Sequence, residues 1–146
     1  MLETFKATVT SMERLQVKAE ARGFEIIMDE PPELGGDDTG MNPVEAILCS
    51  LGSCLSIVVA AFAKAKKFKY QDLRIELEGD LDPDGFMGLA EDVRNGFQEI
   101  RYTFHIKTNE PEEKVKEFLR FVEDSCPVCD ILKNQVPVIR AGIVTD

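Results

Sequence analysis

A long uncharged segment constrains the fold of this chain more than any other feature. Residues 46–63 contain no charged side chain, and apolar or small residues occupy nearly every position around a helix. Asn42 is a good N-cap, Pro43 suits the first helical position, and Glu45 stands where the acid of a capping box belongs. We therefore predict a helix from Asn42 to about Lys67, roughly 36 Å long at 1.5 Å per residue.

Two environments suit such a helix. Its length is sufficient for a transmembrane span, but the sequence has no second span and no aromatic belt, and the flanking residues are typical of a soluble domain. A central helix buried on all sides is the interpretation that we favour, with no membrane partner. A single chain of 146 residues does not easily surround such a helix, so we expect a homodimer.

Composition and charge limit the other possibilities. The length predicts one domain over residues 1–146, and 44% hydrophobic residues are sufficient for a core. A net charge of −10 argues against a nucleic-acid partner, because binding to phosphates needs a basic face. The N-terminus lacks the basic start and apolar run of a signal peptide, which predicts a cytoplasmic protein. Stable disulfides are rare there, so the cysteines are expected to be reactive, metal-binding or plain core residues.

The remaining elements follow from alternation and turn signals. Predicted strands cover residues 3–10, 14–20, 24–28, 70–78, 97–107 and 136–143. A second helix is expected after an Asn109 cap, and a short helical turn through Leu132 follows it. His105 lies in an alternating run and is interpreted as a strand residue without a special role. The resulting order, βββ-α-ββ-α-β, is typical of an α+β fold with mixed or antiparallel pairing.

The four cysteines form two groups. Cys49 and Cys54 lie five residues apart, about 140° around a helix, so they are not a preformed pair. A buried helical cysteine is most often a small core hydrophobe. Because burial raises the pKa of a thiol, a reactive Cys54 needs a positively charged partner.

The second group is Cys126-Pro-Val-Cys129, which has the spacing of redox and zinc motifs. A helix precedes it, whereas thioredoxin-like motifs follow a strand. A four-sulfur zinc site is disfavoured because Cys49 and Cys54 point apart, and we predict neither metal nor cofactor. If folding brings the two groups together, one thiol could attack an oxidant and another resolve the product as a disulfide.

Several stretches resemble the OsmC/Ohr family. They are Pro-Pro-Glu-Leu-Gly-Gly at 31–36, Asn-Pro-Val-Glu-Ala-Ile-Leu at 42–48, Leu-Gly-Ser-Cys ending at Cys54, and the late Cys126-Pro-Val. The likeness extends over nearly the whole chain and includes the element order. Within the family, the residues around Cys54 and Cys126 look most similar to the YhfA-type branch.

The resemblance implies an OsmC-like intertwined homodimer, in which antiparallel or mixed sheets wrap around paired central helices. It implies active sites at the subunit interface and thiol-dependent reduction of organic hydroperoxides or hydrogen peroxide, with an external dithiol as reductant. Cys54 matches the attacking cysteine of the family, and Cys126 matches its resolving cysteine. An arginine from the early strands belongs beside the attacking sulfur, and alignment favours Arg14 over Arg22.

The chain also departs from the family pattern. In the organic-hydroperoxide branch an acid directly follows Asn-Pro, but here that residue is Val44 and the acid is Glu45. Glu45 lies about 180° from Cys54 on a regular helix, so it is either a catalytic acid or only the capping-box residue. Cys129 is an additional thiol that competes with Cys126 as resolver. The predicted function is therefore a thiol peroxidase, and the alternative is an OsmC-fold binding or structural protein without efficient peroxidase activity.

Overall fold

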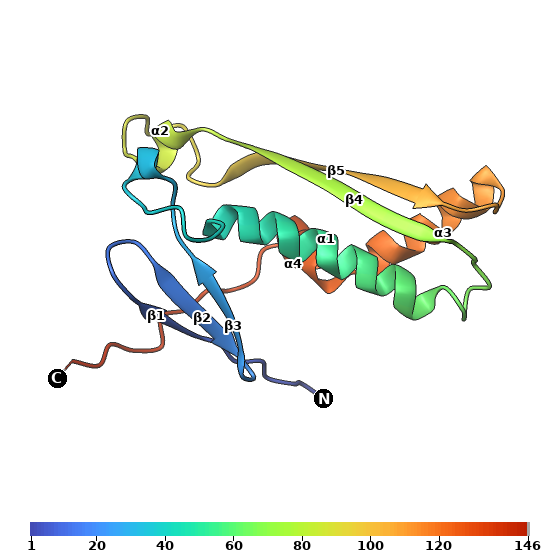
Figure 1. Ribbon diagram of the computed structural model, residues 1–146, viewed down its shortest axis with the longest axis horizontal. Coiled ribbons are helices and arrows are strands. Elements are labelled where there is room, and N and C mark those ends of the chain that lie inside the picture. The colour runs from blue at the N-terminus through green and yellow to red at the C-terminus, as the bar shows by residue number, and fades with distance from the viewer. Residues whose placement is uncertain (146) are drawn as a thin grey trace. The chain divides into compact units, whose positions relative to one another are not determined.

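The computed structural model describes residues 1–145. The chain divides into two compact units, each described here by itself. The first unit comprises Met1–Cys49 and Asp80–Gln98, and the second comprises Ser50–Gly79 and the residues from Glu99 onward. Figure 1 shows the elements with the labels used below.

The first unit contains a three-stranded antiparallel sheet in the order β1-β2-β3. Its strands are β1 (Thr8–Ser11), β2 (Val17–Ala21) and β3 (Phe24–Met28). Arg22 and Gly23, with φ of 52° and 87°, connect β2 to β3, as a two-residue hairpin turn requires. The three predicted strands are confirmed, although β1 begins later than predicted. The strand β2 also begins later, because residues 12–16 form the turn that precedes it.

The first unit also contains two short helical segments. They are the 3₁₀ helix η1 (Pro32–Leu34) and α2 (Pro83–Phe86). Gly36, just after η1, has no room for a side chain, since a Cβ there would lie 1.9 Å from the carbonyl oxygen of Glu30. The chain near Pro-Pro-Glu-Leu-Gly-Gly is therefore folded tightly against its own backbone.

The long helix, α1, covers Pro43–Phe62. The predicted capping box is confirmed: Glu45 N donates to Asn42 Oδ1, and Asn42 N donates to Glu45 Oε1, each at 2.9 Å. The helix ends before the predicted Lys67, and turns follow it. Lys67 adopts a left-handed conformation with φ of 54°, and Phe68 N bonds the carbonyl of Ala63 at 2.8 Å. This pattern is a Schellman-type helix end.

The second unit combines a β-ribbon with helices. The ribbon consists of β4 (Asp72–Leu81) and β5 (Phe97–Lys107). Gln71 N bonds Lys107 O at 2.7 Å, while Arg101 bonds Glu78 further along, so the strands are antiparallel. After β5 come α3 (Glu112–Ser125) and α4 (Pro127–Lys133). Asn109 is not the cap of α3, because Pro111 occupies that position and its carbonyl accepts from Lys114 N and Val115 N.

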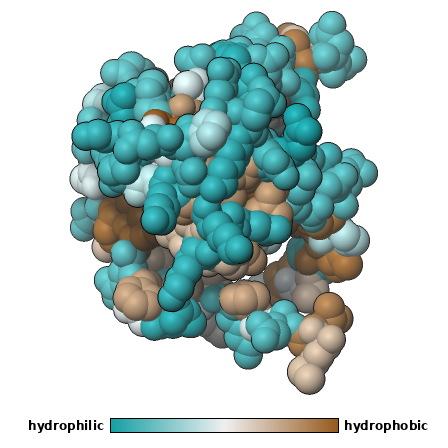
Figure 2. Space-filling model, turned by 90° about the vertical axis from the view of Figure 1, so that its right-hand side faces the viewer, coloured by the Kyte–Doolittle hydropathy of each residue, from teal (hydrophilic) through white to brown (hydrophobic). Residues whose placement is uncertain are grey.

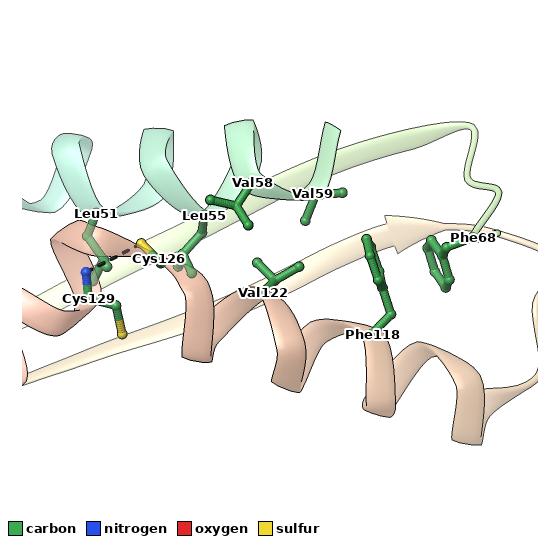
Figure 3. Close-up of a cluster of buried hydrophobic side chains, with 9 residues drawn as sticks. All are labelled: Leu51, Leu55, Val58, Val59, Phe68, Phe118, Val122, Cys126 and Cys129. Carbon is green, nitrogen blue, oxygen red and sulfur yellow. Dashed lines mark hydrogen bonds between the residues drawn. The ribbon is translucent and has the colours of Figure 1, made fainter. Parts of the chain in front are cut away.

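The core of the second unit lies between α1, α3, α4 and the ribbon. Its most deeply buried side chains are Leu55, Val59, Val122 and Cys126, and Figure 3 shows them within the cluster. Phe68 stacks on Phe118 with ring centroids 4.4 Å apart. The buried residues of α3 are Phe118 and Val122, which lie one helical turn apart and face the core. Gly52 lets α1 approach β4, because a Cβ there would lie 2.6 Å from a methyl carbon of Leu77.

The α+β class is confirmed, but the predicted last strand is wrong. Within the described chain, the residues after α4 form neither helix nor strand. Their apolar side chains are among the most exposed in the molecule, as with Val138 at 93% and Val144 at 94%. The apolar pattern at 136–143 favours a strand, but a strand forms only when another strand supplies hydrogen bonds, and none does so here.

By itself, the chain buries only one face of α1. The buried residues of the helix are Leu51, Gly52, Leu55, Val58 and Val59. Ile57 between them is 66% exposed, so the predicted burial on all sides is not achieved within one chain. By length and composition α1 is long and apolar enough to cross a membrane, a test that core helices of soluble proteins also pass. Hydrophobic side chains also lie among hydrophilic ones on the face shown in Figure 2.

Candidate active site

Cys54 lies in the middle of α1, on the border between its buried and exposed faces. The side chain is half-buried and packs against the core of the second unit. Its neighbours in sequence include Leu51 and Leu55, which are 3% and 0% exposed. The thiol therefore lies at the edge of an apolar core while part of it remains accessible to solvent.

Cys126 occupies the junction between α3 and α4 and is 1% exposed. Its backbone is extended, with φ −76° and ψ 114°, which ends one helix and begins the next. Pro127 follows at the first position of α4, where its fixed φ is already helical and its missing N–H is not needed. The Cys126 sulfur accepts a hydrogen bond from Cys129 N at 3.4 Å, drawn as a dashed line in Figure 3.

The two thiols meet in the core of the second unit. Burial, and then a side-chain hydrogen bond with Cys54, raise the pKa of Cys126 to about 11. Both effects disfavour the charged form of the Cys126 thiol. The arrangement pairs a half-exposed sulfur with a buried neighbour that keeps its proton at neutral pH.

A tyrosine and a glutamate lie next to this pair. The Tyr102 hydroxyl, on β5, donates to Glu123 on α3. Burial first, and then the contact with Glu123, raise the pKa of Tyr102, and the charges of Cys129 and Cys126 add to this effect. Neither residue was among the predicted site residues. The alternation of β5 could have placed Tyr102 toward the core, but nothing distinguishes Glu123 from the other acids of α3.

The other predicted site residues belong to the first unit. Arg14 forms an ion pair with Asp37 and donates from Nη2 to the carbonyl oxygen of Gly35 at 2.7 Å. Arg22 stacks over Phe24, with its guanidinium carbon 5.3 Å from the ring centre. Glu45 is engaged in the capping box at the start of α1. Their predicted catalytic roles remain predictions.

The two additional cysteines differ in exposure. All four cysteines are free thiols; Cys49 is exposed on α1, whereas Cys129 is 3% exposed within the core. Among residues 1–145, no group of three or more histidine, cysteine or acidic side chains is arranged to hold a metal ion.

Comparison with known proteins identifies the family. The sequence model of the OsmC-like protein family matches residues 35–139, so the chain belongs to this family. A hydroperoxide reductase of Mycoplasma genitalium is 29% identical over 119 residues, which cover 80% of this chain and 77% of that protein. The Leu-Gly-Ser-Cys54 helix and the late Cys126-Pro-Val both lie within the matched residues.

Solved structures show the same fold. The OsmC-like protein from Mycoplasma pneumoniae superposes with a TM-score of 0.79 at 24% identity, covering 92% of this chain and 91% of that one. An organic hydroperoxide resistance protein from Legionella pneumophila superposes with a TM-score of 0.65 at 17% identity, covering 91% of each chain. The predicted OsmC-like fold is thereby confirmed for the single chain.

Proposed function

We propose that this protein is a thiol-dependent peroxidase that reduces organic hydroperoxides. The observation that carries the proposal is the packing of the half-buried Cys54 against the apolar core that contains the buried Cys126. The family membership and a relative named hydroperoxide reductase support a role in peroxide detoxification. The proposal includes a cytoplasmic location, where thiols stay reduced between turnovers.

In the first step, the Cys54 thiolate attacks the distal oxygen of the hydroperoxide. The O–O bond breaks, Cys54 becomes a sulfenic acid, and the departing alkoxide takes a proton and leaves as an alcohol. Cys54 suits this role because it is the more exposed of the two paired thiols. The apolar side chains around it favour organic hydroperoxides over small hydrophilic ones.

In the second step, Cys126 resolves the sulfenic acid. The Cys126 sulfur bonds to the Cys54 sulfur, and its proton leaves with the sulfenic hydroxyl as water. The raised pKa of Cys126 suits this order, because a protonated thiol does not compete for peroxide. An external dithiol then reduces the disulfide and restores both thiols.

Arg14 and Glu45 are included in the proposal in supporting roles. Arginine keeps its charge at any relevant pH and can donate to both a sulfur and a peroxide oxygen. A second candidate function is that of an OsmC-fold binding or structural protein without efficient peroxidase activity. The observation that favours it is the engagement of Arg14 with Asp37 and Gly35 and of Glu45 with the helix cap.

The proposal includes a homodimer in which a second copy covers the exposed face of α1. That face carries Ile57, and the extended C-terminal residues expose further apolar side chains. An obligate interface of this kind buries about 2,000 Å² or more in total. Light scattering at micromolar concentration is expected to give the dimer mass, and a monomer would contradict this part of the proposal.

The experiment that tests the peroxidase function is consumption of an organic hydroperoxide in the presence of a dithiol. Cys54→Ser is expected to reduce consumption to the background rate, whereas Cys49→Ser, on the same helix, keeps the wild-type rate. Cys126→Ser is expected to leave a sulfenic acid on Cys54 that a dimedone probe traps. A wild-type protein that consumes no hydroperoxide would favour the binding or structural alternative, and a Cys54→Ser protein with normal activity would contradict the role of Cys54.

A further inference from the structure

Three of the four thiols gather in the second unit, with Cys126 in the middle. The Cys126 sulfur accepts from Cys129 N at 3.4 Å, and Cys54 packs against the same buried cluster. Cys129 is 3% exposed and has no role in the reaction proposed above. A buried thiol held beside a resolving cysteine is in a position to react with that cysteine once it is oxidised.

We propose that Cys129 is a second resolving cysteine, which moves the disulfide from Cys54–Cys126 to Cys126–Cys129. This inference rests on the proposed peroxidase function, because the first disulfide must form before it can be moved. In the exchange, the Cys129 sulfur attacks the Cys126 sulfur, and the bond between Cys126 and Cys54 breaks. The proton that Cys129 loses is taken up by the departing Cys54 sulfur. No further oxidant or reductant is consumed.

The backbone around Cys126 makes the second disulfide sterically accessible. Cys126 is extended rather than helical, and its sulfur folds over the first turn of α4, 3.4 Å from Cys129 N. The Cys129 sulfur points away from the Cys126 sulfur in the reduced chain (Figure 3). A rotation of the Cys129 side chain to another staggered rotamer must therefore precede the attack. Such rotations are much faster than disulfide exchange.

Solvation favours the exchange from the Cys54–Cys126 disulfide to the Cys126–Cys129 disulfide. Cys126 and Cys129 are 1% and 3% exposed, whereas Cys54 is half-buried. Thiol–disulfide exchange proceeds through a departing thiolate, and a charge is stabilised most at the sulfur that water reaches best. Expulsion of Cys54 places the developing charge on the most solvated of the three sulfurs. The two sulfurs that remain bonded are then both neutral and buried.

The exchange has a consequence for Cys54 when no reductant is present. Cys54 returns as a free thiol while the chain is still oxidised, so a second hydroperoxide can react with it. Cys126 and Cys129 are then both oxidised and cannot resolve that sulfenic acid, and further peroxide oxidises it to sulfinic acid. Without Cys129, the disulfide to Cys126 keeps Cys54 blocked and protects it.

Mapping the disulfides tests the proposal directly. The reduced full chain receives one equivalent of organic hydroperoxide, is quenched with acid, and is alkylated under denaturing conditions before mass spectrometry. The wild type is expected to show a Cys126–Cys129 disulfide with Cys54 alkylated. Cys129→Ala is expected to hold Cys54–Cys126 instead, and Cys49→Ser, the control for an unrelated thiol, is expected to behave as the wild type.

A second measurement on the wild type keeps the test independent of whether Cys129→Ala folds. With three equivalents of hydroperoxide and no reductant, sulfinic acid is expected to accumulate on Cys54 while the Cys126–Cys129 disulfide persists. Wild-type protein that consumes peroxide but retains Cys54–Cys126 with Cys129 free would overturn the exchange and leave the peroxidase function standing. If the wild type consumes no hydroperoxide, or if Cys54→Ser consumes it at the wild-type rate, the proposed reaction through Cys54 fails, and the exchange fails with it.

Discussion

The two units each bury a polar group, but they surround it differently. In the first unit, the carboxylate of Asp29 accepts hydrogen bonds from three residues. The donors are Glu30 N at 2.8 Å, Asp37 N at 3.3 Å, and the N and Oγ1 of Thr39 at 3.2 and 2.7 Å. In the second unit, the buried Cys126 sulfur has weaker partners, the thiol of Cys54 and the distant N–H of Cys129. The pKa of Asp29 is lowered, first by the Thr39 hydroxyl and then by Glu30 N, whereas burial raises that of Cys126.

The difference shows how the two units use buried polar atoms. A carboxylate surrounded by donors is held in its charged form and fixes the loop around it. A sulfur in an apolar core remains neutral, tolerates weak hydrogen bonding, and can still exchange its proton for a covalent bond. In the first unit, the buried group therefore fixes a loop through hydrogen bonds. In the second unit, the buried group is a thiol that can still form a disulfide.

The largest effect on stability is expected from the core that holds the thiols. Leu55→Ala removes a fully buried side chain on the turn of α1 next to Cys54. The expected loss is about 2–5 kcal/mol in the free energy of unfolding, because a cavity remains. Denaturant titration measures it, and Leu89→Ala, at a residue 70% exposed, is the matched control. Equal losses in both variants would show that this core does not dominate stability.

The next effect is expected in the first unit. Gly36→Ala places a Cβ 1.9 Å from a backbone oxygen of Glu30, which cannot rotate away. Overpacking of this kind costs about 1–3 kcal/mol. Gly96→Ala is the control, because a Cβ there meets nothing within 4 Å. If both alanine variants unfold at the same denaturant concentration, the loop around Asp29 is less rigid than its hydrogen bonds imply.

A smaller effect is expected from the ionisation of Cys126 in alkaline solution. The folded chain keeps this proton up to about pH 11, whereas the ordinary thiol value is 9.0. Between these values the unfolded state binds fewer protons than the folded state, so the free energy of unfolding decreases as the pH rises.

Denaturant titration from pH 8 to 11 measures this decrease in the wild type and in Cys126→Ala. The variant is expected to lose less stability over that range, and Cys49→Ala is expected to follow the wild type. Identical pH profiles for wild type and Cys126→Ala would mean that Cys126 does not keep its proton in the folded chain.

The smallest effect is expected from Asp29 in acid. Its pKa lies below 3.8 in the folded chain, so its charged form stabilises the fold above that value. The stability is lost as the pH falls through the lower, folded pKa, because the folded state must then take up a proton. Asp29→Asn is expected to flatten the loss of stability below about pH 4. An unchanged acid profile in Asp29→Asn would show that other carboxylates dominate acid unfolding.

Local sequence determined much of this protein. Asn42, Pro43 and Glu45 predicted the start of α1, and the structure has the capping box that they imply. The alternation over 97–107 predicted β5 with the bounds that the structure gives. These predictions succeeded because caps and alternating patterns act over a few neighbouring residues.

Tertiary structure decided what depends on distant partners. The apolar residues at 136–143 predicted a strand, but pairing depends on an available strand edge, which no local pattern encodes. The resemblance to the OsmC/Ohr family suggested that Cys54 and Cys126 act together. Only the packing of α1 against the α3–α4 junction places their side chains in contact, half-exposes one and buries the other. Burial and contact arise from residues far apart in the chain, and together they raise the pKa of Cys126.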